Sequence, residues 1–138
     1  MPQHDLHHDA VKNALVKDGW TVTHDPFTIK LDDLKLYVDL AAEKPVLLND
    51  PLQTIAIEIK VFGGLSFITE FEKAVGQYRI YHQFLEELFP ERILYLAVAL
   101  SAFEESFQLP SIQAIVRKQE IRLLIFNAET EEILQWIE

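Results

Sequence analysis

The stretch TIAIEIKVF, residues 54–62, constrains the fold more than any other part of the chain. Its branched apolar residues leave almost no polar face, which is typical of a strand covered on both sides of a sheet. Two glycines end it, and apolar residues then recur at helical spacing over residues 67–89, up to Pro90. Another buried strand is predicted over residues 92–100. This strand–helix–strand order indicates an α/β protein.

The remaining segments extend this unit on both sides. Strands that come in a run before the crossover helix favour a central mixed β-sheet flanked by helices. The length of 138 residues suits a single domain over residues 1–138. The pattern predicts helices over residues 8–17 and 111–118, strands over 20–23, 27–31, 35–41, 122–127 and 133–137, turns at 24–26 and 32–33, and a loop at 49–51.

Composition narrows the functional classes. The chain has no cysteine, which excludes disulfides and any cysteine-based metal site or nucleophile. No apolar run approaches the ~20 residues of a membrane span, and the N-terminus does not resemble a signal peptide, so we expect a cytoplasmic protein without membrane contact. The net charge of −10 argues against simple coating of DNA, since phosphate contacts favour a basic surface.

Two charges interrupt the central strand. Glu58 and Lys60 share one face with Ala56, because side chains alternate along a strand, and their Cα atoms are roughly 6.6 Å apart. Burying an ion costs several kcal/mol unless a partner compensates it. E-x-K is a common tripeptide, however, and such a face is often only solvated or ion-paired. The two charges therefore indicate either a solvated or ion-paired strand face or a functional site.

Asp39 lies on the preceding predicted strand, and we expect it beside Glu58 if the two strands pair. Two carboxylates and a lysine on one spot suit Mg²⁺ or Mn²⁺, which would polarise a phosphodiester and activate a water molecule. Lys60 would orient that water or stabilise developing charge. One ion can bridge the pair only if the carboxylates lie within about 10 Å, since its ligand bonds are about 2.0–2.6 Å long.

The order Asp39, then Glu58-Ile59-Lys60, resembles the PD-(D/E)xK nuclease signature, with Val38 in place of its proline. Gln77 and Tyr81, at i and i+4 of the long helix, match the Q-x-x-x-Y motif of one branch of that superfamily. The alternatives are a plain core aromatic for Tyr81 and a solvated position for Gln77. The superfamily often adds a polar residue from the first helix. His8 is the candidate and Asp9 its substitute, unless this terminus is only frayed and solvated.

Several long blocks together resemble the XisH family, the fdxN element excision controlling factors. They are HDAVKNALVKDGWTVTHDP, KLYVDLAAEK, IAIEIKVF, FEKAVGQYRIY, ERILYLAVA and FQLPSIQAIVRKQEIRLLIFN. The resemblance implies a restriction-endonuclease-like fold and a part in controlled excision of a DNA element. It also implies a companion protein, XisI, and a separate site-specific recombinase.

Two functions therefore compete. One is a Mg²⁺- or Mn²⁺-dependent nuclease that uses Asp39 and Glu58 as metal ligands and Lys60, Gln77 and His8 as further catalytic residues. The other is a regulatory binding module that keeps the nuclease fold and acts through its companion or the recombinase. The intact acidic and basic set favours the first, and the net charge favours the second. We expect weak DNA binding by the isolated chain, and a homodimer stays open.

Overall fold

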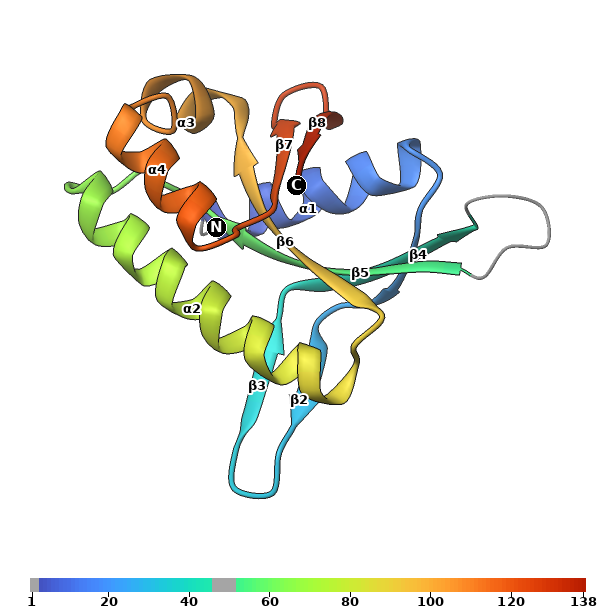
Figure 1. The fold of residues 1–138 in the computed structure, drawn as a ribbon. Coiled ribbons are helices and arrows are strands. Elements are labelled where there is room, and N and C mark those ends of the chain that lie inside the picture. The colour runs from blue at the N-terminus through green and yellow to red at the C-terminus, as the bar shows by residue number, and fades with distance from the viewer. Residues whose placement is uncertain (1–2, 46–51) are drawn as a thin grey trace.

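The computed structural model describes residues 3–45 and 52–138, and the loop predicted over residues 49–51 lies outside them. The chain is an α/β protein (Figure 1). Its elements are α1 (Gln3–Lys17), β1 (Thr21–His24), β2 (Phe27–Lys30), β3 (Lys35–Val38), β4 (Leu40–Pro45), β5 (Leu52–Lys60), α2 (Phe67–Leu88), β6 (Arg92–Ala99), α3 (Leu100–Glu105), α4 (Pro110–Lys118), β7 (Leu123–Asn127) and β8 (Glu132–Ile137).

A six-stranded sheet forms the centre of the molecule, in the order β1-β4-β5-β6-β7-β8. The pairs β5–β6 and β6–β7 are parallel, and the other neighbouring strands are antiparallel. The predicted mixed sheet is thus confirmed, with the long helix α2 as the crossover between β5 and β6. None of the helices in the described part of the chain is long and apolar enough to cross a membrane.

Two apolar cores lie on opposite faces of the sheet, and β5 contributes to both through its alternation. Ile55, Ile57 and Ile59 pack into the core beneath α1. Ala56 packs on the other face with the buried residues of α2, such as Phe71. Figure 1 shows α1 and α2 on either side of the strands. Both faces of β5 are covered, which explains its near-continuous apolar sequence.

The strand predicted over residues 35–41 is divided at Asp39. Its first part, β3, pairs with β2 in a separate two-stranded sheet, and its second part, β4, joins the main sheet beside β5. Figure 1 shows the β2–β3 hairpin projecting from the main sheet. The chain therefore changes from one sheet to the other at Asp39. The alternation of apolar and polar residues continues through Asp39, so the sequence pattern does not reveal this change.

Two helices depart from the prediction by more than one residue. Helix α1 begins at Gln3, earlier than the predicted start at residue 8. Helix α3 was missed, and it has six residues and begins after Ala99 without a capping side chain. Sequence analysis finds helices by their caps and by several turns of periodicity, and α3 offers neither.

Candidate active site

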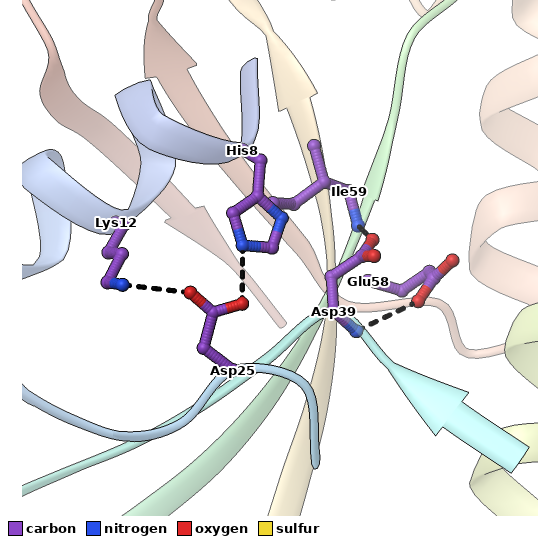
Figure 2. A network of polar contacts seen from close by, with 6 residues as sticks. All are labelled: His8, Lys12, Asp25, Asp39, Glu58 and Ile59. Atoms are coloured by element: carbon purple, nitrogen blue, oxygen red, sulfur yellow. Dashed lines mark hydrogen bonds and ion pairs between the residues drawn. The ribbon is translucent and has the colours of Figure 1, made fainter. Parts of the chain in front are cut away.

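Asp39 and Glu58 come together where β3 gives way to β4. The register pairs Leu40 with Ile57, so Asp39 follows on opposite Glu58. The Oδ2 atom of Asp39 accepts a hydrogen bond from the Ile59 amide at 2.8 Å, and Glu58 Oε1 accepts one from the Asp39 amide at 3.3 Å (Figure 2). These reciprocal bonds fix both side chains to the opposite strand's backbone.

The same contacts bound the distance between the two carboxylates. A carboxylate oxygen of Asp39 lies at most about 5 Å from its own amide nitrogen by covalent geometry. Because that nitrogen is 3.3 Å from Glu58 Oε1, oxygens of the two groups lie within about 8 Å of each other. This bound lies inside the limit of about 10 Å between carboxylates stated above. Two oxygens on one cation must also come within about 5 Å of each other, since each ligand bond is about 2.0–2.6 Å long, and the bound leaves room for that approach.

The environment of Glu58 disfavours its charge. Only 7% of the residue is exposed. Burial, followed by repulsion from the Asp39 carboxylate, raises the pKa of Glu58 to about 8, against the hydrogen bond from the Asp39 amide and the charge of Lys60, which both lower it. At neutral pH and without a cation, Glu58 thus holds a proton beside Asp39.

Lys60 ends β5 and is half-buried between two hollows. One is an open groove of about 440 Å³, whose lining includes Glu58, Lys60 and Glu70. The other, of about 290 Å³, is lined by Lys60 with residues of α1 and α3 such as Leu6 and Glu105. The Lys60 side chain therefore lies beside accessible space on both sides.

Glu70, in the first turn of α2, is a residue that sequence reasoning missed. Its Oε1 atom accepts a hydrogen bond from the Gly64 amide at 2.7 Å. A Cβ at Gly64 would come within 2.3 Å of that oxygen, so a side chain there would displace the Glu70 carboxylate. The G-G-x-x-x-x-x-E spacing could have pointed to this loop contact, but not to its place in the groove.

Gln77 and Tyr81 lie one turn apart on α2. The pKa of Tyr81 is raised by burial and then by the charges of Glu58 and Asp39, so its hydroxyl lies near both acids. The Oε1 atom of Gln77 is buried and accepts no hydrogen bond from any described residue. A buried acceptor without a partner requires a donor from outside the chain, such as water.

His8 is held by a residue that was predicted only as part of a turn. Its Nε2 atom lies 2.7 Å from Asp25 Oδ1, and Lys12 Nζ donates to Asp25 Oδ2 at 2.8 Å. These bonds lower the pKa of Asp25 against the opposing effect of burial. Figure 2 shows this group beside the Asp39–Glu58 pair, whereas Asp9 is exposed. The sequence offered no signal for the Asp25 contact, because it depends on how β1 turns under α1.

The donors in this site suit a hard divalent cation. Mg²⁺ and Mn²⁺ prefer oxygen ligands, and Mg²⁺ keeps several waters when only one or two carboxylates hold it. Among the side chains that the structure describes, no set of three or more His, Asp or Glu residues is arranged to hold an ion. The carboxylate pair is thus the candidate donor set, and a cation there would relieve the repulsion that burial intensifies.

Comparison with known proteins places the chain in a family. The XisH protein family model matches residues 1–134. A crystal structure of an XisH family protein from Nostoc punctiforme PCC 73102 is similar with a TM-score of 0.88 and 39% identity, covering 97% of this chain and 100% of that one.

A crystal structure of an fdxN element excision controlling factor protein from Anabaena variabilis is similar to the same degree. It has a TM-score of 0.88 and 39% identity, and the match covers 97% of this chain and 99% of that one. No curated protein matches. The family match and the two structures bear out the resemblance in the sequence: this chain belongs to the XisH family, the fdxN element excision controlling factors.

Proposed function

We propose that the chain is a metal-dependent nuclease with a restriction-endonuclease-like fold that cleaves DNA phosphodiesters. The observation that carries the proposal is the adjacent pair Asp39 and Glu58, each bonded to the other's strand, with Glu58 buried at 7% exposure. A chain under selection for stability alone has little reason to bury a carboxylate beside another carboxylate.

In this proposal the carboxylates of Asp39 and Glu58 hold Mg²⁺ or Mn²⁺. When bound, the ion would polarise the phosphodiester and lower the pKa of a water ligand. Lys60 faces the groove, orients the attacking water and offsets charge on the phosphate. Gln77 supplies its unpaired Oε1 as an acceptor for a water hydrogen. His8, held by Asp25, completes the polar wall on the α1 side.

Family membership supports a proposal for the biological setting. We propose that the cleavage serves controlled excision of a DNA element, together with the companion factor XisI and a site-specific recombinase. Isolated, the chain carries a net charge of −10 and repels DNA. Its binding to bare DNA is therefore weak, dependent on the cation and sharply lowered by salt, and a companion that covers acidic surface strengthens it.

The experiment is a cleavage assay on supercoiled, linear and branched DNA with Mg²⁺ or Mn²⁺. Glu58→Gln and Lys60→Gln should each lower the rate about 10²–10⁴-fold, the range for a positioned acid or base. The charge-matched controls are Glu87→Gln and Lys30→Gln, which change exposed residues on α2 and β2. Equal rates in all variants would trace the cleavage to a contaminant or to another site.

A second candidate is a regulatory binding module without catalysis. The net charge of −10 favours it, because a free-standing DNA enzyme gains from a basic surface. The regulatory function is favoured if no DNA is cleaved with Mg²⁺ or Mn²⁺ while the chain forms a stable complex with its companion. In that case Glu58→Gln leaves complex formation unchanged.

A further inference from the structure

The arginines of this acidic chain are gathered in one place. The sequence has four, at positions 79, 92, 117 and 122, spread over more than forty residues. They belong to the second half of α2, the start of β6, the end of α4 and the segment before β7. In the fold, β7 begins beside Leu96, four positions beyond Arg92 on β6, so the segments that carry Arg92 and Arg122 are neighbours in the sheet. Figure 1 shows α2 and α4 on the same side of this sheet.

Two neighbouring hollows connect Arg92, Arg117 and Arg122, whereas Arg79 lines neither. Arg92, Arg122 and His82 line a cavity of about 160 Å³ beside the C-terminal half of α2. Arg117 and Arg122 line a second hollow of about 240 Å³. Arg122 belongs to both. Arg79, one position from Tyr78, donates to the Gln119 carbonyl at 2.9 Å, which holds it beside the same corner.

The guanidinium groups are anchored but not saturated. Arg92 donates to the Ile55 carbonyl at 2.9 Å, and its guanidinium carbon lies 4.7 Å from the centre of the Phe27 ring. The Nε atom of Arg122 is buried and has no hydrogen-bond partner among the described residues. Its nearest acid oxygen, Oε1 of Glu138, is 3.9 Å away. The Arg122 side chain as a whole is 36% exposed, so its guanidinium borders the two hollows, and a ligand oxygen there would give the buried Nε–H an acceptor.

Acidic residues also border the cluster and limit what it attracts. Glu86 lines the smaller cavity, and Glu120 and Glu138 line the larger one. A monovalent anion gains little binding free energy beside these carboxylates. A phosphate group has more acceptor oxygens and more charge, and it matches the planar fork of arginine, which a lysine cannot reproduce.

We propose that Arg79, Arg92 and Arg122 form a phosphate-binding site, separate from the Asp39–Glu58 pair. His82 lines the same cavity as Arg92 and Arg122. Its neighbour Tyr81 lies toward Glu58 and Asp39 instead, since successive helix positions point about 100° apart. Arg92 pairs in register with Thr54, four positions before Glu58 on β5. The phosphate comes from the DNA backbone or from a free phosphate or phosphate ester.

The test uses the full chain in EDTA, so that it does not depend on the metal site. Inorganic phosphate is titrated by calorimetry at constant ionic strength. A fluorescent DNA duplex is titrated by anisotropy, with inorganic phosphate as competitor. The variants are Arg122→Gln, Arg79→Gln and Arg122→Lys, which keeps the charge but loses the fork. The control is Lys30→Gln on β2, and thermal melts show that each variant is folded.

Phosphate should bind the wild type and Lys30→Gln equally, and at least about tenfold more weakly to the three arginine variants. If phosphate displaces the duplex and Arg122→Gln weakens duplex binding, DNA is the source. If the duplex binds in EDTA equally to the wild type and Arg122→Gln, while phosphate binding depends on Arg122, the source is a small phosphate compound. Both results support the site. Absence of phosphate binding, or equal binding by the wild type and both glutamine variants, would overturn it. A nuclease result in either direction does not affect this outcome.

Discussion

Replacing Glu58 with glutamine should make the metal-free protein more stable at high pH. Gln keeps the size of the side chain and the acceptor oxygen for the Asp39 amide, but it has no charge. The pKa of Glu58 is raised from 4.5 to about 8 by burial and by Asp39. Between these values the native state keeps a proton that the unfolded chain releases. Stability of the wild type relative to the variant therefore falls as pH rises through that window.

The full difference is at most about 5 kcal/mol, at ~1.4 kcal/mol per pH unit over the window from 4.5 to about 8. Movement of the carboxylate toward the open groove relieves part of the cost, so we expect Glu58→Gln to gain about 2–4 kcal/mol over the wild type between pH 4.5 and 9.

Urea denaturation in EDTA at pH 4.5, 7 and 9 measures this, with exposed Glu87→Gln as the matched control. The control should show no such trend. The reasoning is wrong if the difference between wild type and Glu58→Gln does not grow with pH, or if the glutamine variant is the less stable protein at pH 9.

Two further substitutions test contacts of different strength. The hydroxyl of Tyr78 donates to the Leu94 carbonyl at 3.0 Å and accepts from the Arg122 amide at 3.1 Å, so Tyr78→Phe should lower the unfolding free energy by about 1–3 kcal/mol. Asp25→Asn weakens a pair with Lys12 that is 30–42% exposed, so urea melts should show less than about 1 kcal/mol. A larger loss for Asp25→Asn than for Tyr78→Phe would contradict this ranking.

The faces of the central strand were predictable because the alternation of side chains depends only on neighbouring residues. Alternation along residues 55–61 placed Glu58 and Lys60 on the face away from Ile57 and Ile59, and both isoleucines pack beneath α1. The sequence placed Asp39 beside Glu58 on the condition that their strands pair, and the register of β4 with β5 meets that condition. The break at Asp39 did not, since β3 and β4 share one alternating pattern and differ only in which sheet they join.

The surrounding residues of the site depend on tertiary contacts that no local pattern encodes. Asp25 reaches His8 across 17 residues, and Glu70 reaches back to Gly64 across a loop. The two hollows lined by Arg92, Arg117 and Arg122 likewise join segments that are distant in the sequence. Sequence analysis finds residues that share an element, whereas such contacts arise only when elements pack.

Calorimetric titration of Mn²⁺ into the metal-free protein tests the carboxylate pair most directly. At pH 7 Glu58, with a pKa of about 8, is about 90% protonated, and binding an ion requires that proton to leave. Titrations in buffers of different ionisation enthalpy should therefore show one Mn²⁺ per chain and about 0.9 proton released at pH 7, falling to about 0.1 at pH 9. Asp39→Asn with Glu58→Gln should abolish the binding. Failure of the wild type to bind Mn²⁺, or equal binding by the double variant, would contradict the account.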